Sequence, residues 1–339
     1  MQAKTVLVTG ASGFIGAHCV LDLLANDYKV RATVRTPQRA QELTVLLKQH
    51  APTHTIELAY ADLMRDDGWH DAVQGCDYVL HLASPLPVVQ PDNPNDLINP
   101  ARDGALRVIK AARQGGVKRV VLTSSQAAVG GSRMKSPDYI YNENDWTDIS
   151  DPTVSAYDQS KTIAERAARD YVAQHGDIEL VTVNPGLVYG PILEPKVNTS
   201  LELVKRLMSG ELPVIPNLGY ETVDVRDVAV LHRLAMEHPD AVNGRFMASS
   251  GFMWLHEMAQ LLRQELGEHA KRVPQWRAPS WIFRFLSHFD ASIKTIIPSL
   301  DQYKRVDHSN SVEVLGWQPR SPQESVLATA RSFIDYEIV

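Results

Sequence analysis

Three glycines, each three residues after the last, follow directly on an apolar run near the start of the chain. The run is TVLVT at residues 5–9, and the glycines are Gly10, Gly13 and Gly16. Apolar residues then recur at the i, i+3, i+4 and i+7 spacing of a helix face, at Ala17, Val20, Leu21 and Leu24. This pattern predicts a β-strand, a tight glycine turn and an amphipathic helix, in that order.

Short apolar runs alternate with helical patterns through the first half of the chain. The runs cover residues 5–9, 30–34, 55–59, 77–83, 119–124 and 178–183. Continuous apolar strands separated by helices are typical of a parallel sheet that is covered on both faces. The sequence therefore predicts an α/β fold with a doubly wound parallel (Rossmann) sheet. Its ligand crevice is expected at the carboxyl ends of the strands.

The alternation becomes irregular beyond residue 188. A helix at about 225–237 and an apolar run at 245–248 are expected to return to the main sheet. We predict a cofactor-binding Rossmann domain over 1–188, to which 222–248 returns. A smaller, interleaved C-terminal substrate domain is predicted over 189–221 and 249–339.

Composition excludes several classes of function. The chain has 339 residues, of which 44% are apolar and 22% charged, and its formal net charge is −6. This charge argues against nucleic acid or an anionic membrane as a partner, and no apolar run approaches the ~20 residues of a membrane span. Cys19 and Cys76 fall inside predicted elements without metal or disulfide spacing, so we expect a cytoplasmic protein with no metal site.

The glycine turn suits the pyrophosphate of a dinucleotide. Glycines permit the tight turn and a close approach of the backbone, and the following helix offers its N–H groups and dipole. The GxxGxxG spacing differs from the commonest GxGxxG fingerprint, but its place between a strand and a helix favours a cofactor site. The predicted contacts in this loop are Gly10, Ser12, Gly13, Phe14, Ile15 and Gly16.

The end of the second strand distinguishes NADP from NAD. An NAD enzyme usually carries an acidic residue there, but this chain has Val34 followed by Arg35, with Arg39 one helical turn later. Charged hydrogen bonds contribute roughly 1.5–3 kcal/mol each, so two guanidinium groups would favour a 2′-phosphate on the order of a hundredfold. We predict NADPH or NADP as cofactor. Asp62 is expected near the adenine, and the set of contacts at strand ends also includes Leu63 and Thr123.

A serine, a tyrosine and a lysine follow along the chain. Ser125 comes just after the fifth apolar run, and Tyr157 and Lys161 are one helical turn apart, on one face. An ammonium beside the phenol is expected to lower the tyrosine pKa from about 10. Such a tyrosine can donate a proton to a carbonyl oxygen as a hydride reaches the carbon. Ser125 would hold that oxygen, and Lys161 would also bind the nicotinamide ribose.

With these residues the chain resembles the extended short-chain dehydrogenase/reductases, and most closely their dihydroflavonol-reductase-like branch. That branch includes plant dihydroflavonol and cinnamoyl-CoA reductases and microbial aldehyde and ketone reductases. The matching segments span most of the chain, at residues 6–16, 32–35, 81–85, 122–125, 157–161, 184–191 and 223–229. The resemblance implies that Ser125 rather than Ser124 is catalytic, because Ser125 directly precedes the segment at 126–128.

The resemblance also implies further cofactor contacts. Ala83, Ser84 and Pro85 would line the nicotinamide ribose, and the nicotinamide amide would be flanked by Pro185, Gly186, Leu187 and Val188. Hydride would leave from the B face. Many family members form dimers through the helix that carries Tyr157, so a homodimer is one expected state and a monomer the other.

Two departures from the plant enzymes bear on the substrate. Gly130 stands where dihydroflavonol reductases carry Asn or Asp, five residues beyond the catalytic serine, and the asparagine-tryptophan-cysteine-tyrosine signature of cinnamoyl-CoA reductases is missing. We therefore expect a small apolar or aromatic carbonyl substrate. Its contacts are expected from residues 139–146 and from the aromatic-rich C-terminal third.

The predicted function is NADPH-dependent reduction of an aldehyde or ketone to an alcohol. An NAD-dependent nucleotide-sugar epimerase or dehydratase is the alternative on the same fold, although Val34-Arg35 lacks the carboxylate that it would use. Oxidation of a secondary alcohol, for example a steroid, would use the same site. A non-catalytic NADP-sensing protein is disfavoured because Ser125, Tyr157 and Lys161 are all present.

Overall fold

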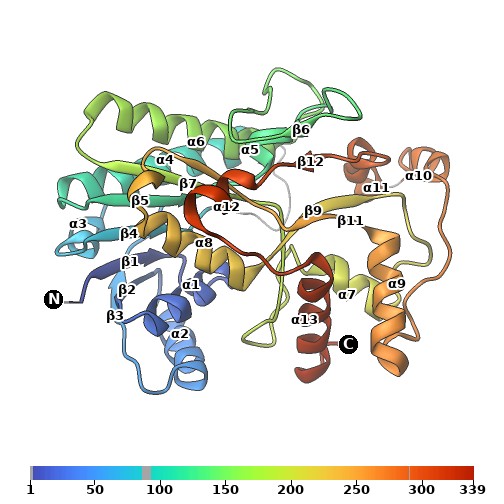
Figure 1. The fold of residues 1–339 in the computed structure, drawn as a ribbon, viewed down its shortest axis with the longest axis horizontal. Coiled ribbons are helices and arrows are strands. Elements are labelled where there is room, and N and C mark those ends of the chain that lie inside the picture. The colour runs from blue at the N-terminus through green and yellow to red at the C-terminus, as the bar shows by residue number, and fades with distance from the viewer. Residues whose placement is uncertain (1–2, 86–92, 290) are drawn as a thin grey trace.

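A seven-stranded parallel sheet forms the centre of the computed structural model, which describes residues 3–85, 93–289 and 291–339 (Figure 1). The strand order is β10-β7-β5-β4-β1-β2-β3, and every pair of neighbours is parallel. The strands are β1 (Thr5–Thr9), β2 (Lys29–Val34), β3 (Glu57–Tyr60), β4 (Tyr78–His81), β5 (Arg119–Thr123), β7 (Glu179–Pro185) and β10 (Arg245–Ala248). The predicted doubly wound fold is confirmed.

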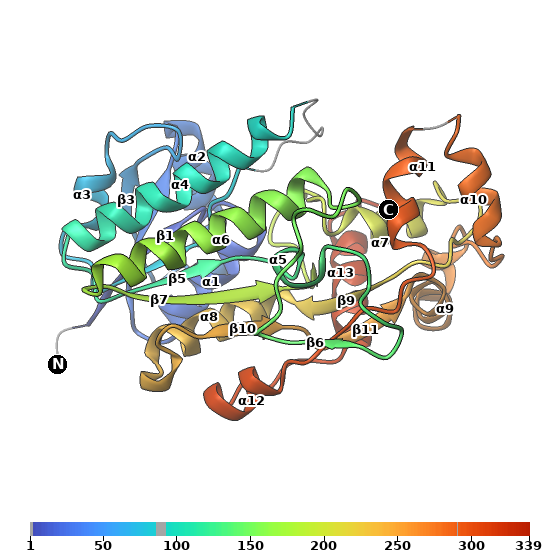
Figure 2. The same cartoon turned by 90° about the horizontal axis from the view of Figure 1, so that it is seen from above.

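Helices cover both faces of this sheet, as the view in Figure 2 shows. One face carries α3 (Trp69–Val73), α4 (Asn95–Gln114) and α6 (Ala156–His175). The other face carries α1 (Phe14–Ala25), α2 (Pro37–His50) and α8 (Val225–Glu237). Because both faces are covered, the strands are largely apolar, and Val6, Leu7 and Val8 are fully buried.

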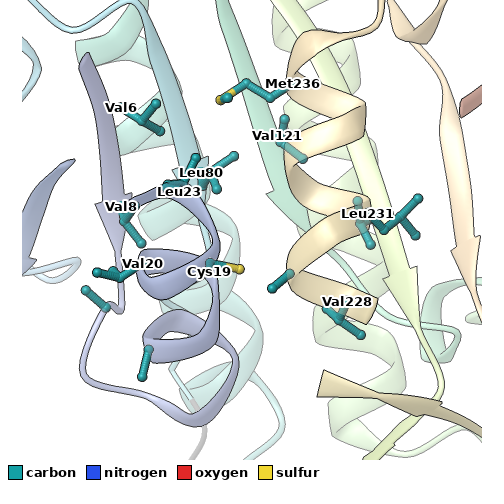
Figure 3. Packing of buried hydrophobic residues seen from close by; sticks show 14 of the residues in the cluster. Val6, Val8, Cys19, Val20, Leu23, Leu80, Val121, Val228, Leu231 and Met236 are labelled. Atoms are coloured by element: carbon teal, nitrogen blue, oxygen red, sulfur yellow. The ribbon is translucent and has the colours of Figure 1, made fainter. Parts of the chain in front are cut away.

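The core on the second face lies between the sheet and the helices α1 and α8 (Figure 3). Val20 and Leu23 of α1 and Leu231 of α8 contribute to it beside strand residues such as Val8 and Leu80. The predicted stripe of α1 is largely confirmed, since Ala17, Val20 and Leu24 are buried and Leu21 is half-buried.

A smaller sheet of three strands, β8 (Leu187–Tyr189), β9 (Gly219–Asp224) and β11 (Gly251–Trp254), lies beyond the carboxyl ends of the main strands. It packs with α7 (Glu202–Ser209), α9 (Leu255–Leu266) and α13 (Pro322–Asp335) around a separate core. The remaining helices are α5 (Ala127–Gly130), α10 (Ser280–Leu286), α11 (Ala291–Ile296) and α12 (Ser309–Leu315). A short parallel pair joins β6 (Ile140–Tyr141) to β12 (Arg305–Val306), and three 3-10 turns cover Pro239–Ala241, Gly267–Ala270 and Ile297–Ser299.

The predicted elements agree with these bounds in most places. The return at 225–237 and 245–248 is observed as α8 and β10. The fourth run was expected to reach residue 83, but β4 ends at His81 because the Ala83 amide donates to the Thr9 hydroxyl instead of a ladder partner. Cys76 lies in the turn before β4 and not within an element. Among the described residues no helix is both long and apolar enough to span a membrane.

Candidate active site

The glycine loop between β1 and α1 is packed so closely that side chains cannot fit. Gly10 has a φ of +68°, and a Cβ there would lie 2.9 Å from the Ala83 amide nitrogen. A Cβ on Gly16 would lie 2.1 Å from the Gly10 carbonyl oxygen. These contacts set α1 directly against the end of β1, at the point where the strand order reverses between β1 and β4.

The N-terminus of α1 is suited to an anion. Its N-cap residue, Gly13, offers no side chain to the first N–H groups, and the first turn holds no acidic residue. Gly13 is exposed, and its neighbours Ser12, Phe14 and Ile15 are half-buried. The loop therefore fits the phosphates of a dinucleotide, which would take hydrogen bonds from N–H groups of the first helical turn.

The ends of β1 and β4 are joined through a hydroxyl. Thr9 Oγ1 lies 2.7 Å from His81 Nδ1 and accepts a 3.0 Å hydrogen bond from the Ala83 amide. This brings Ala83 against Gly10, with Ser84 exposed and Pro85 half-buried directly after it. The structure thus brings the glycine loop and the 83–85 segment together at one crevice.

The two arginines proposed for the 2′-phosphate differ in their surroundings. Arg35 is exposed immediately after β2, whereas Arg39 forms a 2.7 Å ion pair with Glu42 on α2. Asp62 follows Ala61 at the end of β2, where the Ala61 amide donates to the Val34 carbonyl. One oxygen of the Asp62 carboxylate already accepts a hydrogen bond from the Met64 amide.

Two residues predicted to contact the cofactor, Leu63 and Thr123, interact with other parts of the protein. Leu63 packs on Gly104 of α4, and its carbonyl accepts a hydrogen bond from Arg107. The Thr123 hydroxyl lies 2.7 Å from His232 Nε2 of α8, on a buried face of the sheet. The Thr123 side chain therefore contributes to the contact between β5 and α8.

Tyr157 occupies the first turn of α6, whose start is set by a capping box. Ser155 accepts a 3.1 Å hydrogen bond from the Asp158 amide, and the Asp158 carboxylate accepts from Ser155. Lys161 follows one turn later, with its Nζ 5.9 Å from the centroid of the Tyr157 ring. The Ser125 hydroxyl lies close enough to the Tyr157 phenol to affect its pKa, and its Oγ accepts a 3.1 Å hydrogen bond from the Ala127 amide. The predicted trio is assembled at one place.

The electrostatics of the tyrosine differ from the expectation. Burial raises the pKa of Tyr157 above its usual value near 10, and the nearby Ser125 hydroxyl offsets only part of that rise. The prediction of a lowered tyrosine pKa is wrong for this structure, because the loss of water at the phenol dominates. Burial lowers the pKa of Lys161 to about 8, against the opposing attraction of the Glu165 carboxylate.

Glu165 is a residue that the sequence analysis missed. Its side chain is fully buried one turn beyond Lys161, and attraction to two arginines holds its pKa below the usual value despite the opposing effect of burial. It accepts hydrogen bonds from Ser124 (2.5 Å), Arg245 (2.7 Å), Asn184 (2.9 Å), Thr182 (3.1 Å) and Arg169 (3.2 Å). Asn184 also donates to the Ser125 carbonyl, so this cluster fixes the backbone under the serine. The spacing Tyr157–Lys161–Glu165, on one helix face, was the available signal.

The segment after β7 approaches the same place. The Gln126 amide donates to the Pro185 carbonyl, and Gly186 is required because a Cβ there would lie 2.4 Å from the Glu221 carbonyl oxygen. Leu187 and Val188 then begin β8. Leu187 lines the same cleft as Tyr157.

A cleft of about 1160 Å³ opens at Tyr157 between the two parts of the molecule. Its walls come from α6, from the loops at 131–134 and 199–200, and from Arg284, Lys294, residues 297–300, Gln302 and Lys304. Residues 139–146 do not line it, contrary to expectation. Trp146 packs under Arg245, whose guanidinium carbon lies 3.9 Å from the ring centroid, and Tyr141 is buried against Gly130.

The C-terminal aromatic residues do not line the cleft either. Trp276, Trp281, Phe285 and Phe289 are exposed on the surface of the C-terminal part. Among the described residues, Tyr157 is the one aromatic side chain in the cleft wall. The C-terminal third does line the cleft, as expected, but through residues such as Ile297 and Leu300 and not through its aromatic side chains.

Comparisons with known proteins agree with this geometry. The model of the NAD dependent epimerase/dehydratase family matches residues 6–247. Dihydroflavonol 4-reductase of Zea mays is 36% identical over 281 residues, which cover 81% of this chain and 77% of that protein. Cinnamoyl-CoA reductase 1 of Arabidopsis thaliana is 37% identical over 279 residues, which cover 82% of this chain and 77% of that protein.

A solved structure extends the likeness to nearly the whole chain. The yeast methylglyoxal/isovaleraldehyde reductase Gre2, solved with NADPH, has a TM-score of 0.80 and 27% identity, covering 98% of this chain and 99% of that one. The family match and these relatives agree with the resemblance found in the sequence. The chain belongs to the NAD dependent epimerase/dehydratase family, and within it to the dihydroflavonol-reductase-like branch of the extended short-chain dehydrogenase/reductases.

Proposed function

We propose that this protein is an NADPH-dependent reductase that converts an aldehyde or ketone to an alcohol. The observation that carries the proposal is the place of Tyr157 in the wall of a cleft, with Ser125 close to its phenol and Lys161 one helical turn away. The names of the relatives support it, since the plant enzymes and Gre2 are all called reductases.

Bound NADPH supplies a hydride to the carbonyl carbon. Tyr157 donates its phenolic proton to the carbonyl oxygen, and the raised pKa of Tyr157 keeps that proton in place at neutral pH. Ser125 donates a hydrogen bond to the same oxygen, with its hydroxyl oriented by the Ala127 amide. The product is an alcohol whose oxygen carries the proton from Tyr157.

The cofactor would lie across the carboxyl ends of β1, β4 and β5. The free amides at the start of α1 would hold the pyrophosphate, and Arg35 would hold the 2′-phosphate. Lys161 would donate to the nicotinamide ribose, with Ala83 and Pro185 on either side. NADPH in the Gre2 structures supports this choice of cofactor.

Part of the cleft suits an apolar substrate. Leu97, Met134, Leu187, Ile297 and Leu300 present carbon atoms to it. Burial of apolar surface there contributes roughly 25 cal/mol per Å². We therefore propose that the body of the carbonyl compound is apolar.

Steady-state kinetics test the proposal. NADPH and NADH consumption is measured with a panel of aromatic and aliphatic aldehydes and ketones, for the wild type, Tyr157→Phe and Tyr171→Phe. Tyr171 lies on the same helix, near its other end, and is the matched control. Loss of the general acid should reduce kcat by about 10²–10⁴-fold in Tyr157→Phe and leave Tyr171→Phe near the wild type.

Two outcomes would contradict the proposal. If Tyr157→Phe consumes NADPH as fast as the wild type does, Tyr157 is not the general acid. No consumption with any carbonyl compound, together with NAD that copurifies with the protein, would favour the epimerase alternative.

A further inference from the structure

More cationic than anionic side chains line the cleft. Arg133, Arg284, Lys294 and Lys304 face it from three segments, against one carboxylate, that of Asp158. The chain as a whole has a net charge of −6. The cleft is therefore positively charged although the whole chain is net negative. A positively charged cleft raises the local concentration of anionic ligands.

The single carboxylate in the cleft wall, that of Asp158, is hydrogen-bonded to the N-cap residue of α6. Asp158 Oδ2 accepts hydrogen bonds from the Ser155 hydroxyl (2.6 Å) and the Ser155 amide (3.3 Å). Its side chain also packs against Gly131, where a Cβ would lie 2.9 Å from the Asp158 Cβ. Asp158 thus completes the N-terminal cap of α6 and forms no ion pair within 4.0 Å among the described residues.

Lys304 brings a cation close to the catalytic end of the cleft. Its Nζ donates to the carbonyls of Gly130 (2.9 Å) and Ser132 (2.7 Å), in the loop that follows Ser125 and α5. An ammonium has three donors, so these two bonds leave one for a ligand. The two carbonyls hold the ammonium at a fixed place beside Asp158, whose neighbour is Tyr157.

The two arginines have acidic partners outside the cleft wall. Arg133 lies 3.8 Å from Asp151, and Arg284 lies 3.2 Å from Asp301. Both guanidinium groups are exposed, the Arg284 pair lies wholly at the surface, and ion pairs of exposed groups are weak. Neither aspartate is among the cleft residues, so the wall itself presents the cations.

A polar side chain in the same wall adds hydrogen-bonding capacity. Gln302 Oε1 is buried without a hydrogen-bond partner among the described residues. A buried unpaired amide oxygen costs free energy until a donor reaches it, or until the amide turns and donates instead. Gln302 is two residues before Lys304, so both side chains come from one segment.

We propose that the natural substrate is an anionic carbonyl compound, with an apolar body between its carbonyl and a carboxylate or phosphate group. The proposal rests on the function proposed above, since it names the substrate class of that same cleft. The carbonyl lies at Tyr157, the body packs on residues such as Leu187 and Ile297, and the anion is bound by the cationic wall. This arrangement combines apolar burial with a few polar groups that fix orientation.

Three aldehydes of similar shape test the charge. They are 4-carboxybenzaldehyde, 4-formylphenyl phosphate and the neutral methyl 4-formylbenzoate. With saturating NADPH at low ionic strength, kcat/KM should be about tenfold or more higher for an anionic probe than for the ester. Added salt should reduce this advantage, since screening acts on exposed charges. Comparison of the two anions shows which group the cleft prefers.

Charge-removing variants locate the effect. Lys294→Gln and Arg133→Gln alter exposed side chains in the cleft wall, and Lys48→Gln on α2 is the matched control outside it. Each cleft variant should lower the ratio of kcat/KM for the anionic probe to kcat/KM for the ester by about fivefold or more. Lys48→Gln should leave both unchanged.

Binding of the alcohol product separates this inference from the proposed function. Calorimetry of 4-(hydroxymethyl)benzoate and 1,4-benzenedimethanol with the NADP-saturated protein needs no turnover. Tighter binding of the acid, lost in Lys294→Gln, supports the anion site even if no aldehyde is reduced. Reduction of the ester as efficiently as both anions, or equal losses for all probes in the variants, would overturn the inference and leave the reductase function standing.

Discussion

Lys161 shows how a functional side chain reduces stability. Its ammonium is held where burial lowers its pKa to about 8, and the attraction of Glu165 compensates only in part. A pKa below the reference of 10.5 means that the folded state binds the proton less tightly than the unfolded state does. A charged Lys161 therefore costs folding free energy at neutral pH.

Lys161→Met should consequently stabilise the fold while it removes activity. At pH 7 the gain in unfolding free energy should be about 1–3 kcal/mol, since one pKa unit corresponds to about 1.4 kcal/mol and part of the shift is screened. The increase in unfolding free energy over the wild type should be largest below pH 8 and disappear as the pH approaches 10.5. Between these values Lys161 loses its proton in the folded wild type, which removes the cost of the buried charge and makes the wild type more stable. Urea denaturation at several pH values measures this difference.

The control for this measurement is Lys48→Met, at an exposed position on α2. It should change neither the unfolding free energy nor its pH dependence beyond about 0.5 kcal/mol. A Lys161→Met protein that is less stable than the wild type at pH 7 would show that the ammonium contributes more in contacts than it costs in burial.

At the scale of elements, the junction of β2 and α2 should decide between cofactors. Arg35 is exposed there without an ion pair among the described residues, whereas Arg39 is paired with Glu42. Arg35→Ala should lower kcat/KM for NADPH by about tenfold or more, because a charge-assisted hydrogen bond to phosphate contributes roughly 1.5–3 kcal/mol. Activity with NADH should change little.

Arg39→Ala changes the other arginine at this junction and serves as the comparison for Arg35→Ala. Its effect on the NADPH to NADH ratio should be smaller, since Arg39 must leave Glu42 to reach a phosphate. An unchanged ratio in Arg35→Ala would move the 2′-phosphate site away from this junction.

The regular elements could be predicted because their signals are local. The strands of the main sheet are continuous apolar runs, and α8 and β10 were found from pattern alone. Residues 139–146 were misplaced because a distant residue decides their position. Arg245, a hundred residues further on, donates to the carbonyls of Glu143 and Asp145 and stacks on Trp146. No local pattern carries that information.

At the scale of the whole molecule, the cleft is the part that sequence could predict least. Ser125, Tyr157 and Lys161 lie on elements whose order follows from the sheet, so their meeting could be predicted. Lys304 reaches the same place only because β12 pairs with β6 and its ammonium binds the loop after α5. Such a meeting depends on the packing of the C-terminal part as a unit.

The C-terminal part is also built into the core of the main sheet. Trp317 is buried in the cluster around α1 and α8, and its Nε1 donates a 2.9 Å hydrogen bond to the Asp227 carbonyl. Asp227 also accepts from the Arg320 amide at 2.7 Å and forms an ion pair with the Arg320 side chain. Because the chain crosses between the two parts repeatedly, neither core is complete without residues from the other.

This interleaving predicts that the protein unfolds in one cooperative transition. Far-ultraviolet circular dichroism reports on the helices of the whole chain, whereas tryptophan fluorescence includes Trp254, Trp276 and Trp281 of the C-terminal part. The two signals should share one midpoint in urea, as expected for a two-state unit. Saturating NADP, at about 100 times its dissociation constant, should move both midpoints together by an amount that corresponds to about 2.7 kcal/mol. A fluorescence transition that separates from the circular dichroism, and that NADP leaves in place, would show that the substrate-binding part folds independently of the cofactor-binding sheet.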